Sequence, residues 1–254
     1  MLMQEQMIID GLWIMLYRQH SNNEFGANSG FKAFKKRWLN ARNGWYREQI
    51  LNTASFCNNI TNSIKNNNFL IPAIATCLMY MFVFGYIAGA SYSYKEIYNL
   101  DSKTFGLVFG ATGSALLFGA LLSTKLLEVL NMKQLSISGS AIIIFGSIIS
   151  FISSNIDMIG LDGIVIGFFI SFFGLGLAEA SLFSIAMSSQ KTSLGSTAAL
   201  LGSLQLLLPA TSTLVAGYLV EVSIFYWLGF LFILSILSFV FTMIVFKNSK
   251  ILSV

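Results

Sequence analysis

Charged side chains are scarce in this chain, where aspartate, glutamate, lysine and arginine together make up 10% of the 254 residues. An ordinary soluble domain carries about 25% of such residues. The apolar residues, 55% of the chain, gather in blocks of about 20, a length that crosses roughly 30 Å of hydrocarbon. With a mean hydropathy of +0.72, the composition excludes a soluble domain and indicates a membrane protein.

Cysteine and histidine are almost absent. Cys57 and Cys77 are too few for a disulfide framework, and His20 has no second histidine or cysteine at a metal-ligand spacing. The chain also has no nucleophile–base pair, no phosphate-binding loop and no paired carboxylates. We therefore expect no metal, no cofactor and no enzymatic activity.

The apolar blocks predict an all-α membrane protein with six transmembrane helices. They do not alternate apolar and polar residues in segments of about 10, as the strands of a transmembrane barrel do. Helices satisfy their own backbone hydrogen bonds, which lipid cannot do for an open strand. The expected spans are residues 69–91, 105–127, 135–153, 160–187, 196–220 and 224–246.

The charges between the blocks predict the topology. All fifteen lysines and arginines except Lys95 and Lys103 fall on the side of residues 1–68 once six crossings are assumed. The positive-inside rule makes that side cytoplasmic, with both termini inside. This distribution also accounts for the net charge of +4 without nucleic acid as a partner.

The sequence predicts three parts: a basic cytoplasmic segment (1–68), a six-helix bundle (69–246) and a cytoplasmic tail (247–254). Within the first part, residues 31–47 interleave basic and aromatic side chains, a composition that suits the headgroups of anionic lipid. Nucleic-acid binding is the alternative interpretation, but nothing there resembles a recognition fold. The asparagine-rich residues 58–68 are expected to form a loop.

Glu179 is the strongest single candidate for a functional residue, because no other carboxylate lies far from the end of an apolar block. A carboxylate in a span costs about 2–3 kcal/mol on insertion scales, which the surrounding apolar residues can offset. One interpretation places Glu179 in a water-filled cavity, as a proton carrier or a contact for a cationic ligand. The other makes it a structural residue that reaches the interface or pairs with Lys125.

Other side chains in the spans have weaker claims. Gln205 could contact a substrate or bond a neighbouring helix, and Pro209 frees a backbone carbonyl one turn earlier and should bend its helix. The aromatic side chains of Tyr80, Phe84 and Tyr86 would suit an apolar ligand or the core. Gly106, Gly110 and Ser114 have the four-residue spacing that lets membrane helices approach closely.

Three stretches resemble the Bcr/CflA drug-resistance branch of the major facilitator superfamily. Residues 84–91, followed by 94–101 and Phe105-Gly106, resemble the seventh helix of that branch and the loop after it. Residues 176–187 are similar to its tenth helix. The segment Gly195-Ser-Thr-Ala-Ala-Leu-Leu-Gly-Ser-Leu-Gln205 is similar to the start of its eleventh helix. The resemblance covers residues 50–246, which correspond to the C-terminal six-helix half.

This resemblance implies proton-driven efflux of small, hydrophobic or cationic compounds across a bacterial inner membrane. It implies that the first, second, fourth and fifth spans line the pathway, with Tyr80, Tyr86, Glu179, Ser181 and Gln205 as lining residues. Where the family's tenth helix has Pro-Asn, this chain has Ala180-Ser181, and Glu179 is not part of the family pattern.

One six-helix half cannot supply alternating access, which requires two bundles that rock around a central site. The expectation is therefore a half-transporter that pairs with a separate N-terminal half or with a second copy. Two alternatives stay open: a truncated remnant that does not transport, and a membrane protein that binds a partner or lipid through residues 31–47.

Overall fold

The computed structural model describes residues 58–156, 160–188 and 194–247. The chain divides into the units Met1–Asn58 and Asn59–Val254, and the second unit contains the six long helices described here. Residues 1–57, 157–159, 189–193 and 248–254, which include most of the basic N-terminal segment and the tail, lie outside the described residues.

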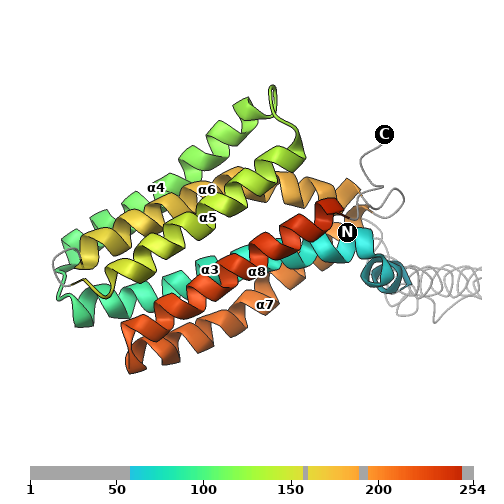
Figure 1. The fold of residues 1–254 in the computed structure, drawn as a ribbon. Helices are drawn as coiled ribbons and strands as arrows, with labels where there is room; N and C mark the ends of the chain where they lie inside the picture. The colour runs from blue at the N-terminus through green and yellow to red at the C-terminus, as the bar shows by residue number, and fades with distance from the viewer. Residues whose placement is uncertain (1–57, 157–159, 189–193, 248–254) are drawn as a thin grey trace, which may run out of the picture. The chain divides into compact units, whose positions relative to one another are not determined.

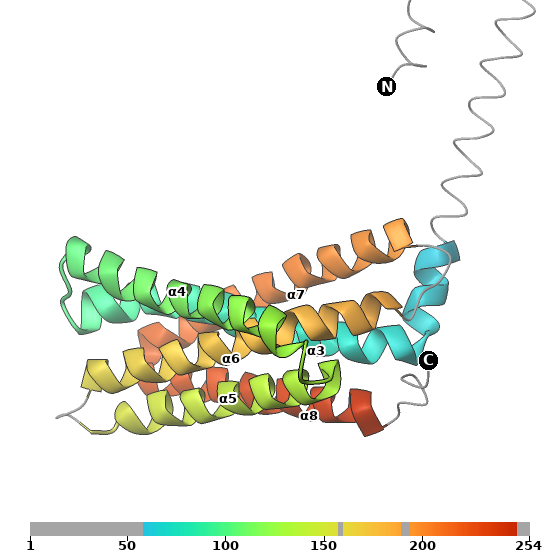
Figure 2. The same cartoon turned by 90° about the horizontal axis from the view of Figure 1, so that it is seen from above.

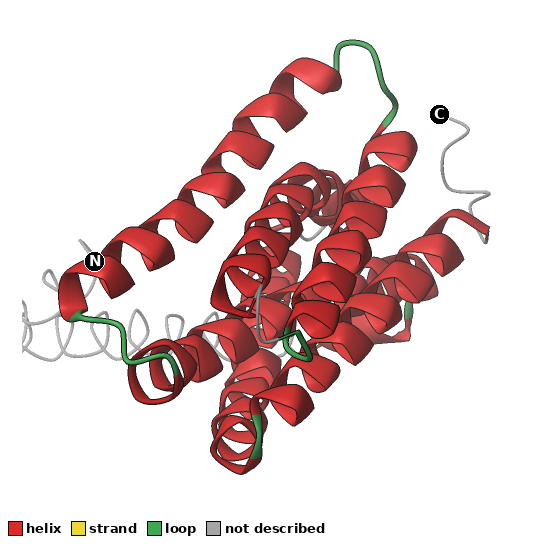
Figure 3. Ribbon diagram, turned by 60° about the vertical axis from the view of Figure 1, so that its left-hand side comes forward, coloured by secondary structure: helices red, strands yellow, loops and turns green. Residues whose placement is uncertain are grey.

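The described part of the chain is helical and contains no strand (Figure 3). All six expected spans are confirmed, and each is long and apolar enough to cross a membrane. The helices are α3 (Asn67–Tyr92), α4 (Ser102–Leu126), α5 (Met132–Ser153), α6 (Gly160–Ser188), α7 (Leu194–Val222) and α8 (Ile224–Lys247). A short π-helix, η1 (Ser93–Ile97), continues α3.

The loop expected over residues 58–68 is wrong. Residues 58–65 are helical, and a single residue, Asn66, separates them from α3. The Asn66 side chain accepts a hydrogen bond from the backbone N–H of Asn68 at 3.0 Å, so asparagine serves as the cap of the next helix. Ile60 packs against a small cluster that includes Phe69, Ala186 and Leu201, and this burial fixes a segment whose composition alone favours a loop.

The six helices form three layers of two (Figures 1 and 2). α5 and α8 form one outer layer, α6 and α3 the middle layer, and α4 and α7 the other outer layer. α6 packs against α5 and α4, while α3 packs against α7, α8 and α6. α4 and α7 do not pack extensively against each other, and they bury the smallest shares of their central residues, 17% and 28%. We call the surface formed by α4 and α7, with α3 and α6 between them, the α4–α7 face.

The close approaches between helices occur at glycines other than Gly106 and Gly110. A Cβ on Gly176 of α6 would lie 2.3 Å from the carbonyl oxygen of Leu116, and one on Gly139 of α5 would lie 2.6 Å from that of Gly174. By contrast, nothing lies within 4 Å of a Cβ built on Gly106 or Gly110. The four-residue spacing of Gly106 and Gly110, which permits a close approach, therefore does not mark one among the described residues.

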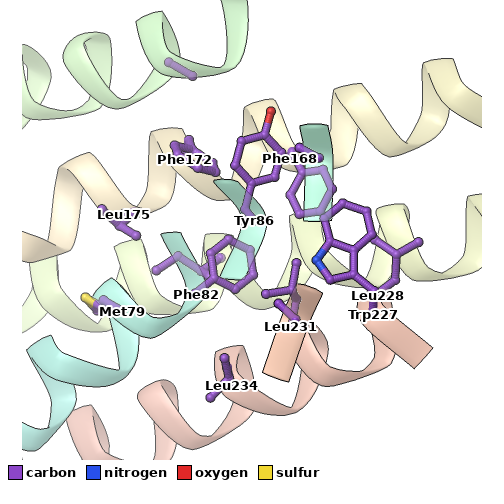
Figure 4. Packing of buried hydrophobic residues seen from close by; sticks show 14 of the residues in the cluster. Met79, Phe82, Tyr86, Phe168, Phe172, Leu175, Trp227, Leu228, Leu231 and Leu234 are labelled. Carbon is purple, nitrogen blue, oxygen red and sulfur yellow. The ribbon is translucent and has the colours of Figure 1, made fainter. Parts of the chain in front are cut away.

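An aromatic core fills the space between the middle helices and α8 (Figure 4). Phe82 and Tyr86 of α3 meet Phe168 and Phe172 of α6, with ring centroids 4.6 Å apart for Tyr86–Phe168. Trp227 of α8 packs on Phe168 and donates its indole N–H to the carbonyl oxygen of Gly85 at 3.0 Å. This core fixes the relative positions of α3 and α6, the two helices that carry the candidate site.

Candidate functional site

A hydrogen bond joins the two middle helices at the α4–α7 face. The hydroxyl of Tyr80 on α3 donates to a carboxylate oxygen of Glu179 on α6. Both side chains are half-buried. Two residues 99 positions apart in the chain, each selected from the sequence, are therefore direct partners in the structure.

Neighbours along each helix place this pair on the exposed side of the middle layer. On α3, Ile87 lies seven residues after Tyr80, hence on the same stripe of a helix with 3.6 residues per turn, and it is exposed. On α6, the residues next to the carboxylate, Ala180 and Phe183, are also exposed. The pair thus faces the α4–α7 face rather than the aromatic core.

Glu179 has no cationic partner among the described residues. Lys125, the partner considered from the sequence, is exposed near the end of α4 and forms no ion pair with it. An unpaired carboxylate within a membrane span is expensive, and such groups are almost always turned toward a protein interior or a water-filled space. The arrangement can accept a proton or a positively charged ligand at the carboxylate.

Tyr86 lies in the aromatic core, away from the Tyr80–Glu179 pair. It is 1% exposed and its hydroxyl lies 2.8 Å from that of Thr112 on α4. Thr112 donates its hydrogen to the carbonyl oxygen of Phe109, so the Tyr86 hydroxyl is the donor to Thr112. Six residues along α3 correspond to about 9 Å of rise, which separates Tyr86 from Tyr80. Tyr86 thus ties α3 to α4.

Ser181 and Gln205 are also buried. Ser181 is 1% exposed, and because it lies two residues after Glu179, its side chain leaves α6 about 200° around the helix from the carboxylate. Gln205 is 7% exposed on α7. Ser181 Oγ and Gln205 Nε2 have no hydrogen-bond partner among the described residues.

Pro209 adds to the unused hydrogen-bonding capacity at Gln205. A proline has no N–H to donate, so the carbonyl of the residue four positions earlier, Gln205, loses its helical partner. Nearby, the Ser212 hydroxyl donates to the carbonyl oxygen of Met81 at 2.6 Å, which sets α7 beside α3. Gln205 lies seven residues before Ser212, about 10 Å along α7, so it does not share the position of the Tyr80–Glu179 pair.

Two partners in this region were not anticipated from the sequence. Thr112, which accepts from Tyr86, looks like an ordinary small residue of α4, and Trp227, which bonds Gly85, looks like an interfacial aromatic residue. Each pairing joins helices far apart in the chain, so no local pattern could reveal it. No group of three or more metal-ligating side chains occurs within the described ranges.

Comparison with known proteins places the chain near transporters. No family model matches it. Over 156 residues it is 28% identical to an uncharacterized MFS-type transporter, YdgK, of Bacillus subtilis (strain 168), a match that covers 61% of this chain and 38% of that protein. This similarity supports membership of the major facilitator superfamily.

A second, shorter match is of a different kind. Over 57 residues the chain is 49% identical to dTDP-rhamnosyl transferase RfbG of Shigella flexneri, which covers 20% of this chain and 20% of that protein. The longer match is to a transporter and not to an enzyme. The chain spans less than half the length of either relative.

Proposed function

We propose that the six helices form one half of a major facilitator transporter that moves small, hydrophobic, cationic compounds out of the cell in exchange for protons. The observation that carries this proposal is the Tyr80–Glu179 pair, a carboxylate on the α4–α7 face with no cation of its own among the described residues. The Bcr/CflA resemblance supplies the direction of transport and the drug-like class of substrate.

The carboxylate explains the choice of a cationic substrate. A positively charged compound or a proton would neutralise Glu179, whereas an anion would be repelled from it. The exposed apolar side chains nearby, Ile87 and Phe183, would contact the hydrophobic part of such a compound. We propose Gln205 as a further contact, through its unpaired Nε2. Tyr86, which ties α3 to α4, would act from behind the pathway, and Ser181 is also buried there.

The α4–α7 face is the surface on which a second bundle would close the pathway. Alternating access needs two bundles around one site, and α4 and α7 are the least buried helices of this one. The second bundle would be a separate N-terminal half or another copy of this chain. The proposal keeps the division into a basic segment (1–68), the bundle (69–246) and a tail (247–254).

The proposed location is a bacterial inner membrane with both termini in the cytoplasm. Six helices long and apolar enough to cross a membrane support this topology, and the excess of lysine and arginine on the side of the termini favours that orientation.

The decisive test is dye efflux from cells that express the chain, compared between the native protein and Glu179→Gln. The native protein should lower the steady-state level of a lipophilic cationic dye, and Glu179→Gln should abolish this effect because the amide can neither ionise nor release a proton. The matched control is Glu128→Gln, which changes an exposed carboxylate in the turn after α4. Efflux that is unchanged in Glu179→Gln would remove this residue from the mechanism.

A second candidate function is binding of a membrane or partner by the basic-aromatic residues 31–47 without transport. Deletion of residues 1–50 separates the two. A native chain that does not lower dye accumulation, with recruitment to the membrane surface that is lost on deletion, favours the binding function. Dye efflux by the native chain that survives the deletion favours transport. No efflux from any variant, alone or with a six-span partner, would indicate a remnant that does not transport.

A further inference from the structure

The seam between α5 and α8 is held by pairs of hydroxyl groups. Ser147 and Ser235 lie 2.8 Å apart, and Ser140 donates to Thr242 at 3.2 Å. From the first pair to the second, the residue number changes by seven in each helix, but in opposite directions. The two helices are therefore antiparallel and in a fixed register. Extended by the same register, Leu135 of α5 lies opposite Lys247 at the end of α8. Lys133 lies two residues before Leu135, about 3 Å from the level of Lys247.

Two lysines therefore flank one end of this seam. The Lys133 ammonium lies 5.9 Å from the centre of the ring of Phe246, the residue that precedes Lys247 in the chain. Both lysines are exposed, and neither forms an ion pair with another described residue. Glu128, the acidic residue described at this end of the bundle, lies in the turn between α4 and α5 and is also exposed.

An apolar stripe on α8 leads from the lysines toward the middle of the membrane. Ile236, Val240 and Met243 are 37%, 43% and 42% exposed. Their spacing of four and three residues, with Lys247 four residues further on, places all four side chains on one side of the helix. The stripe belongs to the layer of α5 and α8, opposite the α4–α7 face (Figure 2).

We propose that the α5–α8 seam binds an anionic phospholipid, with its phosphodiester between Lys133 and Lys247 and an acyl chain along Ile236, Val240 and Met243. The lysines supply charge at headgroup level and the stripe supplies an apolar track at acyl level, which together match a lipid better than a free anion. Lys133 also lies in the first turn of α5, where the helix dipole favours negative charge. The lipid site is independent of the transport proposal, because it needs only the six membrane spans.

Lipid titration of the purified full-length chain tests the site. The delipidated protein is titrated with dioleoyl phosphatidylglycerol, with cardiolipin or with dioleoyl phosphatidylethanolamine, and bound lipid is counted by native mass spectrometry. Both anionic lipids should bind more tightly than the zwitterionic one. Lys133→Gln/Lys247→Gln should weaken phosphatidylglycerol binding about twenty-five-fold, at about five-fold per lysine near the surface.

Lys125→Gln is the matched control, because Lys125 is exposed at the same end of the bundle but on α4, away from the seam. It should change binding less than two-fold, and Lys133→Arg/Lys247→Arg should keep native affinity. Equal losses in the double variant and in Lys125→Gln would overturn the site in favour of diffuse attraction. Native binding by the double variant would also overturn it. Circular dichroism of each variant, compared with the native chain, separates loss of binding from misfolding, and the arginine variant decides the matter if the glutamine variant does not fold.

Discussion

Glu179 depends on one hydrogen bond among the described residues, the one from Tyr80. Removing that hydroxyl leaves a half-buried carboxylate without its donor, and hydrogen bonds to charged groups contribute about 1.5–3 kcal/mol. We predict that Tyr80→Phe lowers the free energy of unfolding by about 1–3 kcal/mol, measured by thermal unfolding in detergent. Tyr218→Phe, which removes an exposed hydroxyl from α7, should leave stability unchanged. Equal effects of the two substitutions would contradict a specific role for the Tyr80–Glu179 bond.

Asp101 caps α4 outside the membrane spans and makes this end of the bundle sensitive to acid. Its side chain accepts a hydrogen bond from the backbone N–H of Lys103 at 3.2 Å. The hydrogen bond from the Thr104 side chain is the main reason that the pKa of Asp101 lies below its usual value of 3.8, and backbone N–H groups add to the effect. Because the pKa is lowered by folding, the stabilisation is complete above pH 3.8 and is lost as the pH falls through the lower folded value.

We therefore predict that Asp101→Asn, which keeps a capping oxygen but cannot titrate, reduces the fall in melting temperature between pH 7 and pH 3. Asp101→Ala should lower the melting temperature already at pH 7, because it removes the cap. Glu221→Gln, which changes an exposed carboxylate at the C-terminal end of α7, is the control. If the melting temperature of Asp101→Asn falls as far between pH 7 and pH 3 as that of the native chain, the cap contributes none of the acid sensitivity.

At the residue scale, the sequence was informative where a side chain conflicts with its surroundings. A carboxylate within an apolar span costs free energy, so Glu179 stands out without any structure. Its partner Tyr80 was one of several aromatic residues of α3 with equal claims. The side-chain direction that separates Tyr80 from Tyr86 depends on which faces of α3 its neighbours cover, and no local pattern contains that information.

At the scale of elements, the glycines of α6 determine how closely its neighbours can pack. Gly176 allows the backbone of α4 to approach, and an added Cβ would meet the Leu116 carbonyl oxygen and the Ala120 nitrogen, neither of which can move aside. We predict that Gly176→Ala lowers the free energy of unfolding by about 1–3 kcal/mol. Gly110→Ala, in the helix opposite, should be neutral or stabilising, because it has open space and alanine is the better helix former. Chemical denaturation of both variants distinguishes them, and equal destabilisation would mean that the α4–α6 approach is looser than described.

The ends of the six helices were predicted to within three residues, because length and hydropathy determine the spans physically. The helix over residues 58–65 was missed since its asparagines favour loops, while Ile60 packs against the cluster that includes Phe69, Ala186 and Leu201. Gly106 and Gly110 have a spacing that permits a close approach, yet a Cβ built on either meets nothing within 4 Å. Spacing shows that a close approach is possible, but which glycines meet a partner depends on the layer order.

At the scale of the whole molecule, the alternation of spans predicts which turns share a side. The described turns before and after α5 contain exposed Glu128 and exposed Asn155, at opposite ends of that helix. In a variant with Cys57 and Cys77 replaced by serine, we predict that Asn155→Cys reacts with an impermeant maleimide on intact cells. Glu128→Cys should react only after permeabilisation. Labelling of both from one face would contradict six crossings, and the reverse pattern would invert the proposed orientation.

The order of the helix layers could not be predicted from the sequence. Six apolar helices of similar length can be arranged in many ways, and the pairing of α5 with α8 depends on hydroxyl contacts such as Ser147–Ser235. The resemblance to the transporter family implied that the first, second, fourth and fifth spans line the pathway. In the structure these are α3, α4, α6 and α7, the four helices that make up the α4–α7 face.

The proline in the middle of α7 has a mechanical consequence. Pro209 leaves a stretch of about 15 residues before it and about 13 after it, each roughly 20 Å long and too short to cross the bilayer alone. The two stretches can tilt relative to each other more easily than in a helix without proline, since one of the backbone hydrogen bonds that span the junction, the one to the Gln205 carbonyl, is missing. We therefore expect α7 to bend at Pro209, so that the stretch that carries Gln205 can move while the stretch after Pro209 stays bound to the Met81 carbonyl by Ser212.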